Sequence, residues 1–204
     1  MIAGAWEQLV AEAPTHPAHG APPHGGASDE SLAAAAAGGD RAGFDALVAR
    51  YADRVHRFVL ARVRDRHDAE EVTQEAFLRA WGAIGRYDGR WRFSTWLFTI
   101  ARREAVTALR RRRGERGEAM AGGDERGFEP AADERGVWAL AGAVLGREEY
   151  EALWLRYVED RSAPEIAIIL GKNVVSVRVM MHRARERLRG ALAAEDGREG
   201  RVQA

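Results

Sequence analysis

The chain has 204 residues, of which 46% are apolar, so it can bury the core of one large domain or of two small ones. It contains no cysteine, which excludes disulfides and thiolate metal sites and fits the cytoplasmic location that we expect. Its 31 basic and 31 acidic residues cancel, yet apart from Lys172 the basic residues are all arginine, the side chain best suited to phosphates and guanine edges. No stretch reaches the roughly 18 apolar residues of a membrane span, so we expect no insertion into a membrane.

Residues 1–28 are predicted to form a flexible leader. The stretch "APTHPAHGAPPHGGAS" consists mostly of Pro, Gly, Ala and His and lacks the periodicity of a helix or a strand. His16, His19 and His24 could in principle hold a metal, but histidines on a segment without structure usually do not. We therefore expect no metal site and no cofactor.

Residues 29–113 are predicted to form an all-helical bundle. An N-cap at Ser28 or Asp29 starts its first helix. A long second helix follows, because apolar residues recur there at spacings of three and four. These residues are Phe44, Leu47, Val48, Tyr51, Val55, Phe58, Val59 and Val63. The third and fourth helices begin at about Asp68 and Ser94, and no segment shows the two-residue alternation of a strand.

A second folded unit is predicted over residues 137–192. Residues 114–136, which are rich in Gly, Glu and Asp, separate it from the first unit and are predicted to be a flexible linker. Residues 193–204 are predicted to be a disordered tail. The fold class that we expect is therefore all-α, with two small helical domains joined by a linker.

The second unit contains the pattern of a helix-turn-helix, in "SAPEIAIILGKNVVSVRVMMHRARERL". Ser162 can cap the first helix, and Gly171 permits a tight turn before a second helix that begins near Asn173. The buried seam of that second helix is predicted to consist of Val177, Met181, Ala184 and Leu188. Its outer face carries Ser176, Arg178, Val179, His182, Arg183 and Arg187. This layout can place a helix in the major groove of DNA, although a helical hairpin with a solvated basic face is the alternative.

Acidic residues recur along the third helix, in "DAEEVTQEAFLRAW". Asp68, Glu71 and Glu75, with Gln74 beside them, form a polar ridge opposite the apolar seam, and we call these four residues the acidic ridge. Such a run is usually a solvated face, but it can also dock a basic partner. The composition does not separate the two interpretations.

Taken together, these residues resemble a bacterial RNA polymerase sigma factor of the extracytoplasmic-function (ECF) group of the sigma-70 family. In the first unit the resemblance runs through "DAEEVTQEAFLRAW" and "FSTWLFTIARR", and in the second through "LWLRYVEDRSAPEIAIILGKNVVSVRVMMHRARERLR". It implies a protein that binds core RNA polymerase and directs promoter-specific transcription initiation, without catalysing a reaction itself.

The resemblance implies a role for each surface. The acidic ridge would contact the clamp helices of the largest polymerase subunit, and the protein would also meet the flap of the core enzyme. Residues 90–113 would open and read the promoter −10 element, and the helix-turn-helix would read the −35 element. The linker would lie in the RNA-exit path, and an anti-sigma factor would hold the protein inactive.

Strand opening exposes unstacked bases, which aromatic faces can receive while arginines hold the phosphates. The residues that we expect to act at the −10 element are Arg90, Trp91, Arg92, Phe93, Arg102, Arg103 and Arg110. Arg111 and Arg112 are further candidates for the phosphates. Trp96 is in phase with Leu97 and Ile100, so we expect it mainly in the core.

The residues that we expect to act at the −35 element are Lys172, Ser176, Arg178, Val179, Arg183 and Arg187. Arg178 and Arg183 are the candidates for base contacts in the major groove, and Lys172 and Arg187 are the candidates for phosphate contacts.

The predicted −35 helix departs from the family pattern. Val174 and Val175 stand where relatives carry polar residues or Gly-Thr, Val179 stands where a serine is common and Met180 where an arginine is common. The helix could therefore prefer a thymine-rich element, through apolar contact with methyl groups, or bind DNA weakly.

The second hypothesis is an interaction protein, a degenerate homologue that binds core polymerase or an anti-sigma factor without reading a −35 element. A free-standing regulator with a helix-turn-helix would leave the first unit unexplained. An enzyme is the least supported class, because His56, His67 and His182 each stand alone and no nucleophile–base set is visible.

Overall fold

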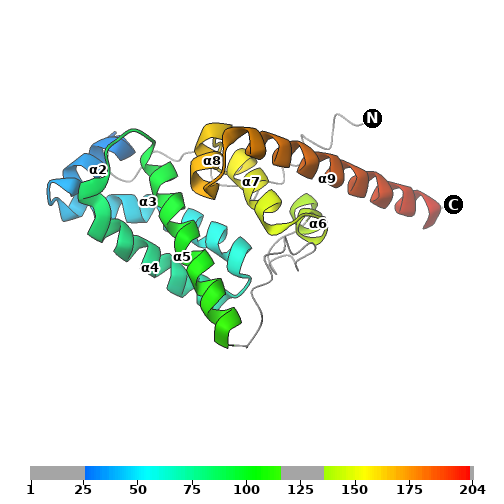
Figure 1. The fold of residues 1–204 in the computed structure, drawn as a ribbon, viewed down its shortest axis with the longest axis horizontal. Helices are drawn as coiled ribbons and strands as arrows, with labels where there is room; N and C mark the ends of the chain where they lie inside the picture. Colours follow the sequence, from blue (N-terminus) through cyan, green and yellow to red (C-terminus); the bar gives the residue numbers. More distant parts are fainter. Residues whose placement is uncertain (1–25, 116–135, 203–204) are drawn as a thin grey trace. The chain divides into compact units, whose positions relative to one another are not determined.

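The computed structural model describes residues 26–115 and 136–202, and every regular element in these ranges is a helix (Figure 1). The chain divides into two compact units. The first is built from α2–α5, and the second from α6, α7, α9 and most of α8. The predicted all-α fold with two helical domains is confirmed. Most of the leader, including its three histidines, and most of the linker lie outside the described residues.

Over residues 26–115, the first unit contains four α-helices and one short 3-10 helix. Their bounds are α2 Asp29–Ala37, α3 Arg41–Val63, α4 Arg66–Ala83, η1 Ile84–Arg86 and α5 Phe93–Glu115. Ser28 is the N-cap of α2, and its hydroxyl accepts a hydrogen bond from the Ser31 N–H at 3.1 Å. Arg64, at φ +62°, ends α3 in the left-handed region, and Asp65 then caps α4. The third helix therefore begins two residues before the predicted start at Asp68.

The core of the first unit lies between α3 and the helices α2, α4 and α5 that pack against it. Leu47, Val55 and Val59 of α3 are fully buried, as the predicted apolar stripe requires. The ring of Phe58 meets that of Phe98 on α5 edge-to-face, with 5.1 Å between centroids. Burial of this stripe, more than helix propensity, stabilises a helix as long as α3.

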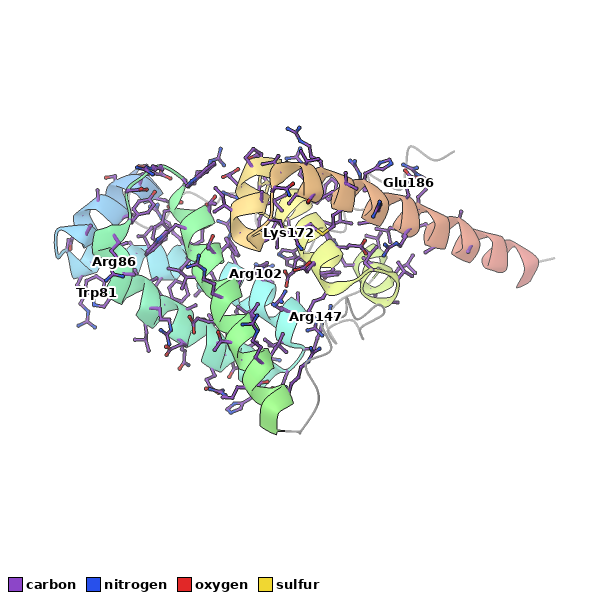
Figure 2. The ribbon with its side chains drawn as sticks, in the orientation of Figure 1. Trp81, Arg86, Arg102, Arg147, Lys172 and Glu186 are labelled. Atoms are coloured by element: carbon purple, nitrogen blue, oxygen red, sulfur yellow. The ribbon has the colours of Figure 1, made fainter. Side chains whose placement is uncertain are left out.

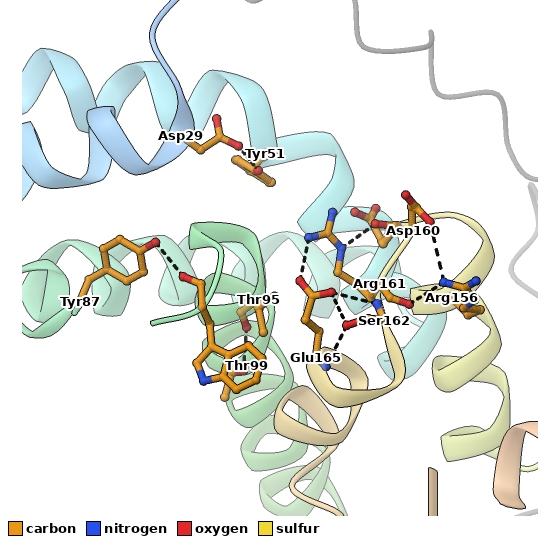
Figure 3. Close-up of polar contacts among 12 residues, drawn as sticks. Asp29, Tyr51, Tyr87, Thr95, Thr99, Arg156, Asp160, Arg161, Ser162 and Glu165 are labelled. Atoms are coloured by element: carbon orange, nitrogen blue, oxygen red, sulfur yellow. Dashed lines mark hydrogen bonds and ion pairs between the residues drawn. The ribbon is translucent and has the colours of Figure 1, made fainter. Parts of the chain in front are cut away.

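Asp29 fixes α2 against α3. One of its carboxylate oxygens accepts a hydrogen bond from Arg50 Nη1 at 2.6 Å. The other accepts a hydrogen bond from the hydroxyl of Tyr51, as Figure 3 shows. Burial, followed by the neighbouring Asp29 carboxylate, raises the pKa of the Tyr51 hydroxyl well above its usual range. The phenol therefore stays a donor, and Asp29 acts as a tether rather than as the helix cap.

The second unit is built around an aromatic cluster. Its helices are α6 Val137–Val144, α7 Arg147–Tyr157, α8 Ala163–Leu170 and α9 Val174–Val202. Trp138 of α6 packs against Tyr150 and Trp154 of α7, with ring centroids 5.4 and 5.3 Å apart. Both α6 and α7 pack against α9.

Side-chain caps delimit the predicted helix-turn-helix. Glu165 accepts hydrogen bonds from the backbone N–H and the hydroxyl of Ser162, at 2.9 and 2.6 Å, which forms a capping box at the start of α8 (Figure 3). Gly171 adopts φ +65° in the turn, a conformation that other residues rarely tolerate. Asn173 caps α9 by accepting the Ser176 N–H at 2.7 Å. The predicted helix–turn–helix layout is confirmed.

Two predicted boundaries are wrong. Helix α5 continues through Gly114 to Glu115, into the predicted linker. Helix α9 continues to Val202, so the predicted disordered tail 193–204 is helical over almost all of its length. Glycine disfavours a helix by only about 1 kcal/mol relative to alanine, and this segment also contains alanines and charged residues that favour a helix.

In the parts of the chain that the structure describes, no helix is long and apolar enough to span a bilayer.

Candidate functional site

The acidic ridge lies on α4, as the spacing predicts. Glu71 and Gln74 are exposed, whereas Asp68 and Glu75 are half-buried. Glu75 binds Arg79 at 2.9 Å, and Arg79 in turn binds Glu104 of α5 at 3.0 Å. The ridge is therefore partly engaged in ion pairs within the first unit.

The basic end of α5 folds against the start of the acidic ridge. Arg112 reaches Asp65 at 3.2 Å and Asp68 at 2.5 Å, and Arg111 reaches Glu71 at 3.3 Å. Arg111 and Arg112 were predicted to bind phosphates and Asp68 and Glu71 to bind a protein partner, yet here they bind one another. The sequence does not reveal this pairing, because 40 residues or more separate the partners.

Asp65 makes the start of α4 sensitive to acid. Hydrogen bonding from the Asp68 N–H, at 2.9 Å, and then the nearby Arg112 guanidinium lower the pKa of the Asp65 carboxyl below its usual range. A carboxylate with a lowered pKa stabilises the fold at pH above its unfolded pKa, about 3.9, and this contribution is lost as the pH falls through the folded value.

We predict that Asp65→Ala destabilises the first unit at pH 7 and that the difference from the wild type shrinks as the pH falls below about 4. Denaturant unfolding at a series of pH values measures this difference. A difference that stays constant down to pH 2.5 would contradict the assignment.

The exposed stripe of α4 continues beyond the acidic ridge as an apolar surface. Glu71, Gln74, Leu78 and Trp81 follow one another at steps of three and four residues and so share one face. Leu78 is 66% exposed, and Trp81, which is labelled in Figure 2, packs against the ring of Phe44 and is still 38% exposed. Sequence reasoning missed these two residues, although the same spacing that defined the ridge points to them.

Tyr87 pins the loop that leads into α5. Its hydroxyl donates to the backbone carbonyl oxygen of Trp91 at 2.8 Å (Figure 3). Burial, followed by the surrounding carboxylates, raises the Tyr87 pKa to about 12, so the phenol keeps its proton. Gly89 turns the chain at φ +69°, and Arg90 binds Asp88 at 3.1 Å.

Trp91 and Phe93 lie in opposite environments. The Trp91 side chain is 42% exposed at the end of the loop, and Arg90 and Arg92 beside it are exposed as well. Phe93 is fully buried, and its ring contacts those of Tyr51, Tyr87 and Trp96 at 5.7, 5.8 and 5.7 Å.

The prediction that Phe93 receives an unpaired base is therefore wrong, because a ring enclosed by three others has no free face. Trp96 is expected mainly in the core, but it is only half-buried. One side of its ring packs against Tyr87 and Phe93.

The predicted phosphate-binding arginines of α5 divide between two faces. Arg103 and Arg110 are exposed and lie seven residues apart, on one side of the helix, whereas Arg102 is half-buried and lies about 100° around the axis. Arg103 also lines a hollow of about 390 Å³ between α4 and α5, together with Arg79 and Glu104.

The outer face of α9 is placed as predicted. Val177, Ala184 and Leu188 are buried, and Met181 is half-buried. The exposed residues over the first turns are Val175, Ser176, Arg178, Val179, His182 and Arg183. Within the described residues, the side chains of Arg178 and Arg183 take part in no ion pair.

Two of the predicted phosphate contacts are instead ion pairs with α7. Lys172 binds Glu148 at 2.8 Å, and Arg187 binds Glu149 at 2.5 Å. Glu149 is buried and also accepts the Gly146 N–H at 3.1 Å, so Arg187 holds α9 against α7. Arg187, which is predicted to contact a phosphate, is thus engaged within the second unit in this structure.

Comparison with known proteins identifies both units. Residues 47–115 match the family model of sigma-70 region 2, and residues 143–188 match that of sigma-70 region 4. The sigma-H factor of Pseudomonas aeruginosa is 32% identical over 182 residues, covering 80% of this chain and 93% of that protein. The ECF sigma factor SigC of Mycobacterium tuberculosis is 35% identical over 167 residues, covering 78% of this chain and 88% of that protein.

This chain belongs to the ECF group of the sigma-70 family.

The two regions of this sigma factor coincide with the surfaces described above. Region 2 spans most of α3 together with α4 and α5, and so includes the acidic ridge and the Trp91 loop. Region 4 spans α7, α8 and the first half of α9. A solved structure of CnrH in complex with the cytosolic domain of CnrY has a TM-score of 0.62 and 30% identity, and covers 81% of this chain and 97% of CnrH. The resemblance of the sequence to an ECF sigma factor is thus confirmed.

Proposed function

We propose that the chain binds core RNA polymerase in the cytoplasm and directs it to a set of promoters, while the polymerase alone catalyses RNA synthesis. The observation that carries the proposal is the alignment with sigma factors over 88–93% of their own length, through both units and in the same order. In the proposed division of roles, the first unit takes the core enzyme and the −10 element, and the second unit takes the −35 element.

The polymerase surface is the exposed stripe of α4. Glu71 and Gln74 supply its polar half and Leu78 and Trp81 its apolar half, and protein interfaces combine apolar and polar side chains in this way. Asp68 and Glu75 support it at its edge. A basic partner helix is the complement that these charges favour.

The −10 surface is the Trp91 loop with the exposed side of α5. Trp91 offers an accessible ring for an unstacked base, worth roughly 1–3 kcal/mol for each base stacked. Arg90, Arg92, Arg103 and Arg110 surround the strand path as phosphate ligands, and Arg102 supports them from a half-buried position. Phe93 holds the loop in place from the core.

The −35 surface is the outer face of α9, in which Arg178 and Arg183 reach the bases and Ser176 lies on the same side of the helix as Arg183. Lys172 and Arg187 reach phosphates only if they exchange their α7 carboxylates for them. This engagement also favours the second candidate function, a sigma-like protein that binds core polymerase without reading a −35 element. Footprinting of the holoenzyme separates the two, since the second candidate protects the −10 region alone.

An anti-sigma factor is the partner that we propose for the inactive state. CnrH, the structural relative at 30% identity, was solved with the cytosolic domain of CnrY. A competitor for the α4 stripe would keep the chain from core polymerase.

The function is tested by runoff transcription with core enzyme and genomic fragments, alongside gel filtration of the chain with core enzyme. We expect a stable complex and initiation at a small set of sites. The proposal fails if no complex forms and no fragment supports initiation.

Charge reversal on α4 tests the polymerase surface. We predict that Glu71→Lys weakens binding to core enzyme about tenfold or more, because like charges meet across the interface. Glu70→Lys is a matched control, since Glu70 and Glu71 are 56% and 58% exposed and each pairs with an arginine. Glu70 lies about 100° around the helix from Glu71, so its reversal should leave the affinity nearly unchanged. Equal losses of affinity for the two variants, in a titration with labelled core enzyme, would contradict the assignment of the polymerase surface to the stripe that contains Glu71.

A further inference from the structure

The outer face of α9 has an apolar centre between cationic flanks. At about 100° per residue, Val175 and Val179 lie about 40° apart, opposite the buried seam of Val177, Ala184 and Leu188. Both are apolar side chains that remain accessible to solvent, with exposed fractions of 68% for Val175 and 43% for Val179. They stand one helical turn apart, close enough to form one contact surface.

Arg178 and Arg183 lie on opposite sides of this valine pair, and His182 lies beside it on the same face. Within the described residues neither arginine side chain is held by a carboxylate. The first carboxylate on this side of α9 is that of Glu186, two turns beyond Val179, and Arg189 binds it at 2.6 Å. The charge around the valines therefore favours a polyanion over a protein surface.

We propose that Val175 and Val179 determine promoter specificity by packing on the 5-methyl groups of thymines in the major groove. The major-groove edge of a thymine presents a methyl group and the O4 acceptor, and apolar side chains contact the methyl group. This inference rests on the proposed reading of a −35 element by α9. It adds the class of base that the centre of the face recognises, while Arg178 and Arg183 hold the flanks.

Two further cationic side chains explain why we expect the base contacts at the valines and not at the ends of this face. Lys172 and Arg187 mark the two ends of this face along the chain. They form ion pairs with Glu148 and Glu149 of α7, at 2.8 and 2.5 Å. The part of α9 that is free to enter a groove is thus the stretch between them, and the valines occupy its middle.

The test begins with holoenzyme, formed from core polymerase and the full chain, which selects duplexes from a library randomised upstream of a fixed −10 element. Each thymine of the selected element is then replaced by deoxyuridine, which removes the 5-methyl group and keeps every hydrogen-bonding group. We expect one or two replacements to weaken binding by about fourfold. Val175→Ala or Val179→Ala should abolish that penalty, whereas His182→Ala should leave it in place.

Three results would overturn the inference. A deoxyuridine penalty of equal size in the wild type and in both valine variants would mean that other residues contact the methyl groups. No penalty in the wild type would mean that the methyl groups are not recognised. Valine variants that no longer form a complex with core enzyme in gel filtration would make this face a protein contact. The proposed function is judged separately, because wild-type holoenzyme that protects no −35 region, with no effect of Arg183→Ala, contradicts the reading of DNA by α9 itself.

Discussion

Replacing Phe93 with alanine is expected to lower the free energy of unfolding of the first unit by about 3–5 kcal/mol. The ring is fully buried and contacts three other aromatic rings, so its removal leaves a cavity that rigid neighbours cannot fill. Amide hydrogen exchange of peptides from α3 and α5, followed by mass spectrometry, measures the change within this unit.

Trp91→Ala is the matched control, an aromatic residue two positions away. It should cost the first unit much less stability than Phe93→Ala does, because Trp91 is 42% exposed whereas Phe93 is fully buried. It should instead impair open-complex formation on a promoter far more than core binding, as followed with permanganate footprinting. If Phe93→Ala leaves exchange unaltered and reduces strand opening alone, Phe93 acts on DNA after all and its assignment to the core is wrong.

Arg187→Ala is expected to destabilise the second unit by about 1–3 kcal/mol. The substitution leaves the buried Glu149 carboxylate with the Gly146 N–H but without its charged partner. Because Arg187 itself is about a third exposed, water can reach the carboxylate in part, which keeps the expected cost below that of a fully buried pair. Thermal unfolding of the full chain, with exchange of α7 and α9 peptides, measures the loss.

Arg183→Ala separates DNA binding from stability on the same helix. Its side chain is exposed, so stability should change by less than about 0.5 kcal/mol, while protection of the −35 region should fall. The opposite outcome, in which Arg187→Ala is neutral for stability and Arg183→Ala unfolds the unit, would contradict the division of roles that we draw along α9.

The sequence predicts the fold well where periodicity governs it. The stripe that includes Leu47, Val55 and Val59 becomes the core because a helix that long must bury one face. Ser162 and Asn173 delimit the helix-turn-helix because their side chains satisfy the free N–H groups at helix starts. These are local effects, and a single sequence displays them.

Periodicity does not govern the loop before α5. Phe93 and Trp91 look alike in the sequence. The Phe93 ring is enclosed only because Tyr51 and Tyr87 pack against it. The ion pairs Arg111–Glu71 and Arg187–Glu149 join residues about 40 positions apart. No pattern in the sequence links such partners, so cations that the chain itself neutralises were predicted to meet phosphates.

We expect the ion cluster of Asp65, Asp68 and Glu71 with Arg111 and Arg112 to weaken the response of promoter binding to ionic strength, should either arginine exchange its carboxylate for a phosphate. An arginine that binds a phosphate releases a condensed counterion from the DNA, which gives log K a slope of roughly −0.9 against log salt for each contact. An arginine that leaves a carboxylate in order to bind a phosphate exposes that carboxylate, and the carboxylate then attracts a cation from solution. The net release is then smaller than the number of contacts. The salt slope for this protein would therefore undercount the phosphates that it holds.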